Sequence, residues 1–428
     1  MLTPRVKKLL AVVAVLLGLL SVGSRVRFSL SIHGVTNDFT QDYVAARAWA
    51  DHTDPYELTS VLVKRYLHSR ASNFDIDPYN QRTPHPPAML GVFRLVSWMP
   101  YNAARITWLF VMSAITAFGF GLLARVLGAK KKVAWVVGIG SLAIPVVQSD
   151  LTYGQSNGLL AMLLIAAWLA LRKDQDRVAG LSLGIATALK LFPLFMVLPL
   201  IRLRRWRALG WHLGTLAVLS GASSLAIGGS SSSEFLRHVS RDNFRFWRGA
   251  PFNLSILSVP YRWLTRSIWR PSAPELPLLA LILVVALVLW LVASPLITPA
   301  CLTKDVFWEA IPFMLLATPT LWETYLVLMV PIVFLMINRV VGGRGRVHWL
   351  TLLAAALSLI GLFPGLPPAL HTSALVQVFG FSWAMYGLVF LAARSFMGES
   401  LADEPATDTR ERETLWAQPL TLRSPSRA

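Results

Sequence analysis

Long apolar runs limit what this chain can fold into more than any other feature of its sequence. The runs are about 18 to 25 residues long, and each could cross the hydrocarbon core of a bilayer, which is about 30 Å thick. Only 14% of the 428 residues are charged, whereas an average soluble domain carries about 25%. The sequence therefore predicts an all-α, polytopic membrane protein.

The opening segment, MLTPRVKKLLAVVAVLLGLL, has the basic start and apolar centre of a signal peptide, but no small-x-small cleavage site follows it. We interpret it as an uncleaved first membrane helix whose basic start lies in the cytoplasm. This orientation predicts a plasma-membrane protein with two outer loops, 32–100 and 229–276, and both termini in the cytoplasm. The C-terminal residues 396–428 are polar and poor in large apolar side chains, which predicts a disordered cytoplasmic tail.

The membrane domain, residues 1–395, is predicted to hold about twelve transmembrane or half-membrane helices. Residues 178–201 have charged flanks that both fall in the cytoplasm, so this segment is expected to enter and leave by one face. Lys190 and Pro193 lie near its middle, where two half-helices would be joined. The other spans are expected at 9–31, 101–126, 133–149, 157–171, 208–228, 277–297, 306–319, 325–338, 347–364 and 373–393.

The net charge of +18 would suggest a nucleic-acid partner in a soluble chain. In a membrane protein, basic cytoplasmic loops and anionic lipid headgroups explain much of this charge, so no nucleic acid is expected as a partner. The loop 229–276 is rich in arginine, but long loops are translocated largely regardless of charge. The single cysteine, Cys301, excludes an intrachain disulfide.

Acidic residues gather directly after the first predicted helix, in TNDFTQDYVAARAWADHTDPYEL, residues 36–58. Three further polar stretches, YGQSN, RDNFRFWRGAPFNLS and TPTLWETY, fall on the same outer side in this topology. The cytoplasmic loops are short and basic and carry no such constellation. Chemistry is therefore expected outside the cell or at the outer membrane interface.

The order of these motifs resembles glycosyltransferase family 87. The likeness extends from about residue 30 to 340 and rests on the acidic first loop, then His-Pro-Pro, Tyr-Gly-Gln-x-Asn, Lys-x-x-Pro and Trp-Glu. Members are GT-C type membrane enzymes that use polyprenyl-phosphate-mannose, among them the phosphatidylinositol-mannoside mannosyltransferases. The resemblance implies a GT-C fold with short interfacial helices in its outer loops.

The implied reaction is an inverting transfer of mannose or a related hexose from a polyprenyl-phosphate donor to a glycolipid or glycan acceptor. A carboxylate near the attacking hydroxyl takes its proton, and cationic or hydrogen-bonding groups stabilise the departing phosphate. Because the leaving group is already a phosphate, no metal or other cofactor is needed in principle, and no cluster of ligands at metal spacing is apparent in the sequence.

Asp38 occupies the position of the presumed general base in this family. If the stretch is helical, Asp42 lies on the same face and can raise the pKa of its neighbour. The alternatives are that Asp38 caps the following helix and that Asp42 lies on a solvated helix face. Asp54 is expected to shape a turn before Pro55.

Residues 57–70 place Leu58, Val61, Leu62 and Tyr66 on one side of a helix. This pattern is typical of a helix lying in the outer membrane interface, and equally of an amphipathic helix packed on the core of the loop itself. In either position the helix would help to wall a site at headgroup depth.

Several substrate-binding residues are implied by matches to the family motifs, and each has a structural alternative. His85 contacts substrate, or lies in a rigid turn set by the neighbouring prolines. Tyr153, Gln155 and Asn157 begin a helix, where the two amides bind sugar hydroxyls or cap the helix. Lys190 is an intramembrane cation, which contacts the donor phosphate or holds the broken hairpin through its free carbonyl groups.

Two further groups of residues match the second outer loop and the Trp-Glu motif. Arg245 and Arg248 are suited to bind a phosphate or lipid headgroups, and Asn253 and Ser255 are expected to line the site. Near the end of the likeness lie Trp322, Glu323 and Thr324, all expected in the site. Family members commonly carry a histidine where Thr324 stands, so the donor, the acceptor or the activity itself can differ here.

Two other classes of function remain open at this point. A secondary transporter or flippase would place ionisable residues near the bilayer midplane, often at matching positions of two repeats. No repeat is visible in this sequence, and only Lys190 is expected to lie deep. A non-catalytic scaffold of the cell envelope is the second alternative, chiefly because of Thr324.

Overall fold

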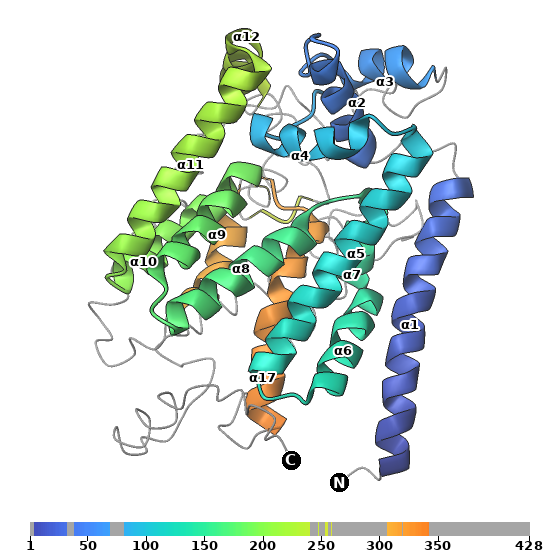
Figure 1. Cartoon of the computed structure of the whole chain (residues 1–428), viewed down its shortest axis with the longest axis vertical. Helices are drawn as coiled ribbons and strands as arrows, with labels where there is room; N and C mark the ends of the chain where they lie inside the picture. The colour runs from blue at the N-terminus through green and yellow to red at the C-terminus, as the bar shows by residue number, and fades with distance from the viewer. Residues whose placement is uncertain are drawn as a thin grey trace, which may run out of the picture.

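The computed structural model describes residues 4–31, 38–68, 81–239, 247, 253–255, 258, 306–318 and 320–341. Within these ranges the protein is helical and contains no strand, which confirms the predicted all-α class for the described part of the chain. Long helices form a bundle, and a layer of short helices covers one end of it, at the top of Figure 1. The spans expected at 277–297, 347–364 and 373–393 and the tail 396–428 lie outside the described residues, so the count of about twelve helices stays a prediction.

Two described helices are long and apolar enough to cross a membrane. They are α1 (Pro4–Ser31), through its residues Lys8–Arg27, and α5 (Tyr101–Val126). The bounds of α5 agree with the predicted span 101–126. Leucines along α1 are exposed, which suits a helix that faces lipid on most of its circumference.

The third predicted span, 133–149, is bent rather than straight. It consists of α6 (Lys131–Gly140), a short turn η2 (Ser141–Ala143) and α7 (Pro145–Tyr153). The helix axis bends by 66° between residues 131–143 and 145–153. The bend follows from Pro145, because proline disfavours a helical conformation in the residue before it, and Ile144 is extended here. The helical part also continues to Tyr153, so Asp150, expected in an outer loop, lies inside a helix.

Glycines allow the helices of this part of the bundle to approach closely. A Cβ atom on Gly138 of α6 would lie 2.3 Å from the carbonyl oxygen of Ala117 in α5, and one on Gly18 of α1 would lie 2.1 Å from that of Ile139. Small residues at contact points are typical of helix packing in membranes, where van der Waals contact replaces the hydrophobic effect.

The predicted break at Lys190 is present in the structure. Lys190 adopts an extended conformation between α9 (Asp176–Leu189) and the turn η3 (Phe192–Met196), which continues into α10 (Val197–Arg202). The preceding and following helices are α8 (Asn157–Arg172) and α11 (Trp206–Ile227).

Arg205 holds the two ends of this broken segment together. Its guanidinium contacts Asp174 at 2.5 Å and Asp176 at 3.5 Å, and it donates a hydrogen bond to the carbonyl oxygen of Leu171. Residues 176–205 therefore leave and return at one place, as expected for a hairpin that enters and leaves by one face.

The covering layer contains three short helices of the first predicted loop, α2 (Asp38–Ala50), α3 (Thr59–Leu67) and α4 (Pro87–Ser97). Next to it lie α12 (Gly229–Glu234) and a π-helical turn, η4 (Phe235–Val239). An aromatic cluster joins the layer to the bundle, because Phe39 of α2 lies within 6.3 Å of the ring centres of Phe93 and Trp108.

The short helix α3 packs on the core of the layer, which is one of the two positions expected for it. Leu62 and Val63 are buried, whereas Leu58 and Val61 are exposed. The expected grouping of Leu58 and Val61 with Leu62 is therefore wrong. The predicted turn at Asp54 is confirmed, since its carboxylate accepts a hydrogen bond of 3.0 Å from the backbone N–H of Tyr56.

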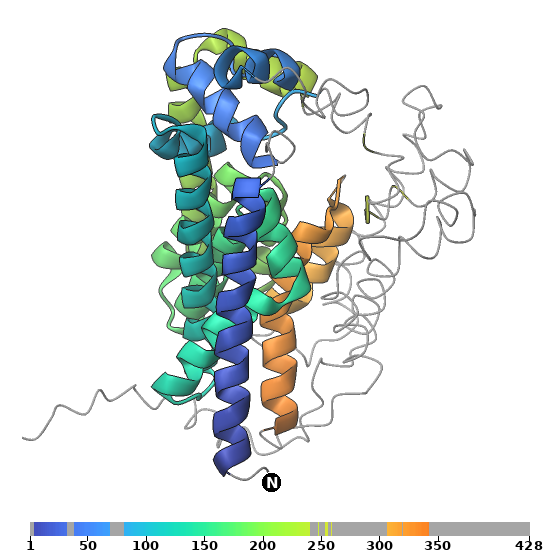
Figure 2. The same ribbon diagram turned by 90° about the vertical axis from the view of Figure 1, so that its right-hand side faces the viewer.

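The last described helices complete the bundle, as Figure 2 shows from the side. They are α16 (Val306–Ala317), a 3₁₀ turn η6 (Glu323–Met329) and α17 (Val330–Val341). Exposed tryptophans mark both ends of the bundle: Trp98 follows α4, Trp135 lies near the start of α6, and Trp206 begins α11. Such aromatic belts are typical of the two membrane–water interfaces.

Candidate active site

Asp42 and His85 form a buried pair beneath the covering layer. The imidazole Nδ1 lies 2.8 Å from Oδ1 of Asp42, and the Thr83 hydroxyl donates to the same oxygen at 2.7 Å. Asp42 is 2% exposed, so the alternative of a solvated helix face is wrong. The backbone carbonyl of His85 in turn accepts a hydrogen bond from the Tyr56 hydroxyl. This arrangement fixes the ring and directs Nε2 away from Asp42.

The prolines around His85 explain how the chain presents it. Pro86 is extended and Pro87 begins α4, where the missing N–H of proline is no loss. The rigid turn expected from the sequence is therefore present. It is compatible with a substrate contact, because the turn sets the position of the imidazole.

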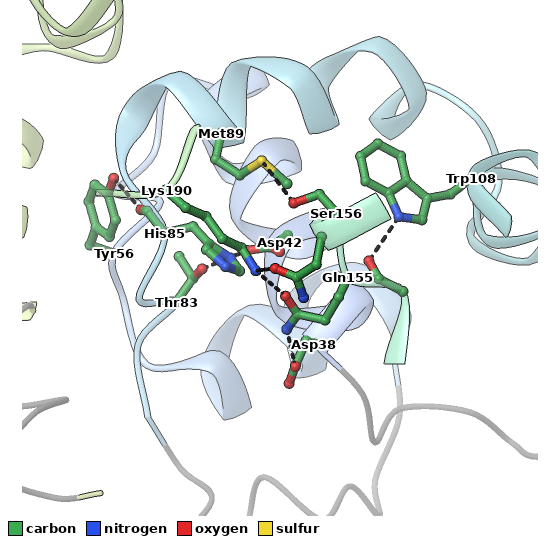
Figure 3. A network of polar contacts seen from close by, with 12 residues as sticks. Asp38, Asp42, Tyr56, Thr83, His85, Met89, Trp108, Gln155, Ser156 and Lys190 are labelled. Atoms are coloured by element: carbon green, nitrogen blue, oxygen red, sulfur yellow. Dashed lines mark hydrogen bonds and ion pairs between the residues drawn. The ribbon is translucent and has the colours of Figure 1, made fainter. Parts of the chain in front are cut away.

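Asp38 begins α2 and lies in the same group of charges as Asp42 and His85 (Figure 3). Its carboxylate accepts a hydrogen bond from the Gln155 side-chain amide, which belongs to another part of the chain. Asp38 is partly exposed, unlike Asp42. Burial of the carboxylate raises the pKa of Asp38, and the hydrogen bond from Gln155 and the charge of His85 act in the opposite direction.

Lys190 extends from the break of the hairpin into the middle of this network. Its ammonium group donates to Oε1 of Gln155 and, at 3.0 Å, to Oδ1 of Asn157. It also lies 4.6 Å from the centre of the Tyr325 ring. Lys190 is only 3% exposed, and Figure 3 shows its side chain pointing to the Gln155 amide that faces Asp38.

The motif YGQSN forms the turn that carries both amides into the network. Gly154 ends α7 in a left-handed conformation, with φ of 71°, and its carbonyl accepts a hydrogen bond from the Trp108 indole. Asp150 then binds the start of α8, because its carboxylate accepts from the Asn157 amide at 2.7 Å and from the backbone N–H of Gly158 at 3.2 Å. Tyr153 of the same motif is exposed, unlike Gln155 and Asn157.

The Trp-Glu stretch approaches the network through Tyr325, two residues after Glu323. Tyr325 stacks on Phe192 with ring centres 5.0 Å apart, and Lys190 lies over the same ring. Glu323 accepts a hydrogen bond from the Ser149 hydroxyl on α7. Thr324 is buried, and its hydroxyl has no hydrogen-bond partner among the described residues.

Residues of the second predicted outer loop are brought close to the same stretch. Trp247 packs edge-on against Trp322 at 5.1 Å. The Asn253 side chain accepts hydrogen bonds from the backbone N–H groups of Ser255 and Leu321, at 3.0 and 2.9 Å. Asn253 and Ser255 are fully buried, so the structure gives Asn253 the role of joining two loops.

Two predicted phosphate ligands, Arg245 and Arg248, lie outside the described residues, and their role stays a prediction. Among the residues that are described, no three His, Cys, Asp or Glu side chains are grouped closely enough to hold a metal ion.

Comparison with known proteins identifies the family. Residues 84–319 match the sequence model of glycosyltransferase family 87. The chain belongs to this family. The matched region of this family 87 protein includes His85, Gln155, Asn157 and Lys190, whereas Asp38 precedes it.

Two relatives of this family 87 protein are named for their activities. An alpha-(1->3)-arabinofuranosyltransferase of Corynebacterium glutamicum is 28% identical over 210 residues, which are 48% of this chain and 46% of the relative. A polyprenol-phosphate-mannose-dependent alpha-(1-2)-phosphatidylinositol pentamannoside mannosyltransferase of Mycobacterium tuberculosis is 26% identical over 220 residues, 50% of this chain and 48% of the relative. The chain thus matches about half the length of each. No solved structure matches it.

Several residues of the network were not singled out from the sequence of this family 87 protein. Asp150, Thr83 and Tyr325 are among them. Asp150 carries a usable signal, because an acidic residue inside a membrane helix is a functional candidate by default, but the predicted helix ended at residue 149. Thr83 and Tyr325 join the site through contacts with residues far along the chain, which no local pattern reveals.

Proposed function

We propose that this protein is a membrane glycosyltransferase that moves a sugar from a polyprenyl-phosphate donor to a hydroxyl group of a glycolipid or glycan. The family membership supports the reaction class, and the mannosyltransferase relative supports a lipid-linked donor. The donor sugar in the proposal is mannose or a related hexose. The arabinofuranosyltransferase relative makes a pentose the natural second donor to test.

One observation carries the proposal, namely the position of the Asp38 carboxylate. It is partly exposed at the first turn of α2, and Gln155 donates the one side-chain hydrogen bond that it accepts from the described part of the chain. A carboxylate held in this way keeps lone pairs for an incoming hydroxyl group. Its raised pKa suits a general base, because proton transfer is most efficient when the pKa of the base approaches the working pH.

The proposed chemistry requires one bond to form and one to break. The acceptor oxygen attacks the anomeric carbon from the face opposite the phosphate, while Asp38 takes the hydroxyl proton. The bond from the anomeric carbon to the phosphate oxygen breaks, and polyprenyl phosphate leaves with the electron pair. The sugar is transferred with inversion, and no metal takes part in the proposed step.

His85 and Asp42 have separate roles in this proposal. Asp42 is buried and has hydrogen bonds from two groups, so it is less suited to accept a further proton than Asp38. It positions His85 through the contact at Nδ1. The other ring nitrogen, Nε2, is left to form a hydrogen bond with the phosphate of the donor or with a sugar hydroxyl.

The proposed reaction takes place on the extracytoplasmic side. The covering layer with Asp38 lies at the end of the bundle opposite the basic start of α1 (Figure 1). Because basic segments are retained in the cytoplasm, the site faces outward. The bilayer would present the polyprenyl chain of the donor at this boundary.

The proposal is tested by replacing Asp38 with Asn in the membrane-embedded protein. Transfer of labelled sugar from polyprenyl-phosphate-mannose and from polyprenyl-phosphate-arabinofuranose to an envelope glycolipid extract is measured. We expect Asp38→Asn to reduce transfer about 10²- to 10⁴-fold, the usual contribution of a general base. Asp51→Asn is the matched control, since Asp51 is an exposed carboxylate just after α2. Near-normal turnover of Asp38→Asn would remove the base assignment.

A further inference from the structure

We propose that Lys190 is a positioning residue, which fixes the side-chain amide of Gln155 so that its N–H group faces Asp38. In this role Lys190 acts on the base through Gln155 and does not itself bind the donor phosphate. The inference rests on the proposed glycosyl transfer, and it gives the lysine at the break of the hairpin a role in that reaction.

The contacts of Lys190 are all with the protein. An ammonium group has three N–H donors and no acceptor. Two of its hydrogen bonds go to Oε1 of Gln155 and Oδ1 of Asn157, and the Tyr325 ring lies against the same nitrogen at 4.6 Å. Lys190 is 3% exposed, so protein groups cover nearly all of its surface.

The chemistry of these groups allows only one orientation of the Gln155 amide. Lys190 is a pure donor and must face the carbonyl oxygen, while an ionised Asp38 is a pure acceptor and must face the amide nitrogen. Both conditions are met, since Oε1 accepts from Lys190 and Nε2 donates to Asp38. The positive charge also polarises the amide and strengthens its donation to the carboxylate.

Asn157 and Asp150 keep Lys190 in place. Asn157 accepts from Lys190 through Oδ1 and donates to Asp150 through Nδ2, so its own orientation is fixed by the same logic. Asp150 supplies a nearby negative charge for the buried ammonium. Lys190, at the break of the hairpin, is therefore connected to Asp38 through the Gln155 amide and to Asp150 through the Asn157 amide, and it sets the orientation of both.

The expected consequence of losing Lys190 concerns the acidity of Asp38. Among the described residues, the charged and hydrogen-bonding groups that act on Asp38 are Gln155, His85, Asp42 and Lys190, and the Tyr325 hydroxyl lies close enough to interact with its charge. The Gln155 hydrogen bond and the charges of His85 and Lys190 lower the pKa of Asp38, and the charge of Asp42 raises it. Without Lys190 the amide can flip, so the pKa of Asp38 rises further and the base becomes protonated at a higher pH.

The test is the pH profile of kcat/KM for the full-length Lys190→Met protein, with polyprenyl-phosphate-mannose as donor and an envelope glycolipid extract as acceptor. Activity falls as the pH drops through the pKa of the base, and we expect this acid limb to move up by about one pH unit. Far above the limb, most of the activity should return, with the KM for the donor nearly unchanged. Lys132→Met, at an exposed lysine in the first turn of α6, is the matched control.

A lysine that binds phosphate would give a different result, namely a raised KM for the donor with the acid limb in its original place. That result would overturn the inference while leaving the proposed function intact. If the unaltered protein transfers no sugar from either donor, the proposed function fails instead.

Gln155→Met provides an independent arm, which decides the question if Lys190→Met does not fold. It removes the amide and leaves Lys190 in place, and we expect a similar upward shift of the acid limb. Where both single variants fold, the double variant should shift the limb no further than either one. An unmoved limb in Gln155→Met would reject the role of the amide.

Discussion

Gly154 shows how much of the site depends on a single backbone conformation. Its φ of 71° turns the chain between α7 and α8, and the next residue, Gln155, then reaches both Asp38 and Lys190. A Cβ atom on Gly154 would also lie 2.5 Å from Cβ of Phe39, which begins the aromatic contact between the bundle and the covering layer. Space and backbone conformation therefore both require glycine here.

We expect Gly154→Ala to destabilise the protein by about 1–3 kcal/mol and to reduce sugar transfer, because the Gln155 amide would move. Thermal unfolding in detergent and turnover are the two measurements. Gly128→Ala is the control, since Gly128 also has a positive φ, of 99°, but nothing lies within 4 Å of its added Cβ. Equal losses in the two variants would mean that the contact with Phe39 has no effect.

The sequence indicated many residues of the site but not how they are paired. Motif resemblance pointed to Asp38, His85, Gln155 and Lys190, and the structure brings all four into one network. The sequence could not show that Asp42 bonds to His85, because the two residues lie far apart in the chain. Nor could it separate a sugar ligand from a structural amide, since that depends on which partners are already bonded.

At the scale of helices, α5 and α6 illustrate packing through small residues. Gly138 lies against the backbone of α5, and Gly121 of α5 lies against that of α6, where an added Cβ would come within 3.1 Å of the Ala134 carbonyl. The close approach lets backbone atoms of the two helices touch. This contact keeps α6 in place, and through it the bend that leads to α7 and Asp150.

Gly138→Ala is expected to lower the stability of the protein by about 1–3 kcal/mol, because the added methyl group meets a rigid carbonyl rather than a flexible side chain. The melting temperature in detergent checks this. Gly214→Ala on α11 has nothing within 4 Å and is the matched control; it should be neutral or gain up to about 1 kcal/mol from better helix propensity. A loss as large in Gly214→Ala as in Gly138→Ala would contradict the packing argument.

Helix bounds followed from the apolar runs wherever a helix is straight and surrounded by charged loops, as for α5. The bend in α6 and α7 was missed because a proline within an apolar run is compatible with a kinked or a straight span. The buried side of α3 was assigned incorrectly because the periodicity fits several faces of a short helix. Which face is buried depends on α2, against which it packs.

For the whole molecule, the opposite ends of the bundle differ in charge and in structure. One end has the covering layer with the acidic residues of α2 and its following turn, and the other has the basic starts of α1 and α6. This asymmetry agrees with the orientation inferred from the sequence, in which the site faces out of the cell. The number of crossings could not be obtained in the same way, because the last predicted spans lie outside the described residues.

We expect Asp51→Cys, in the exposed turn after α2, to react with a membrane-impermeant maleimide on intact cells. Lys132→Cys, at the start of α6, should react only after the membrane is permeabilised. Both variants are made after replacing the native Cys301 with Ser, and labelling is measured by a mass shift on a gel. Labelling of Lys132→Cys in intact cells, with Asp51→Cys protected, would reverse the orientation.

The ion pairs of Arg205 hold the two ends of the hairpin together, and this matters for any topology that is inferred from a hydropathy plot. Because residues 176–205 return to their starting point, the predicted topology gives this apolar segment no net crossing of the bilayer. Counting this segment as one membrane crossing would change the total number of crossings from even to odd, or from odd to even. Every later segment would then be assigned to the wrong compartment.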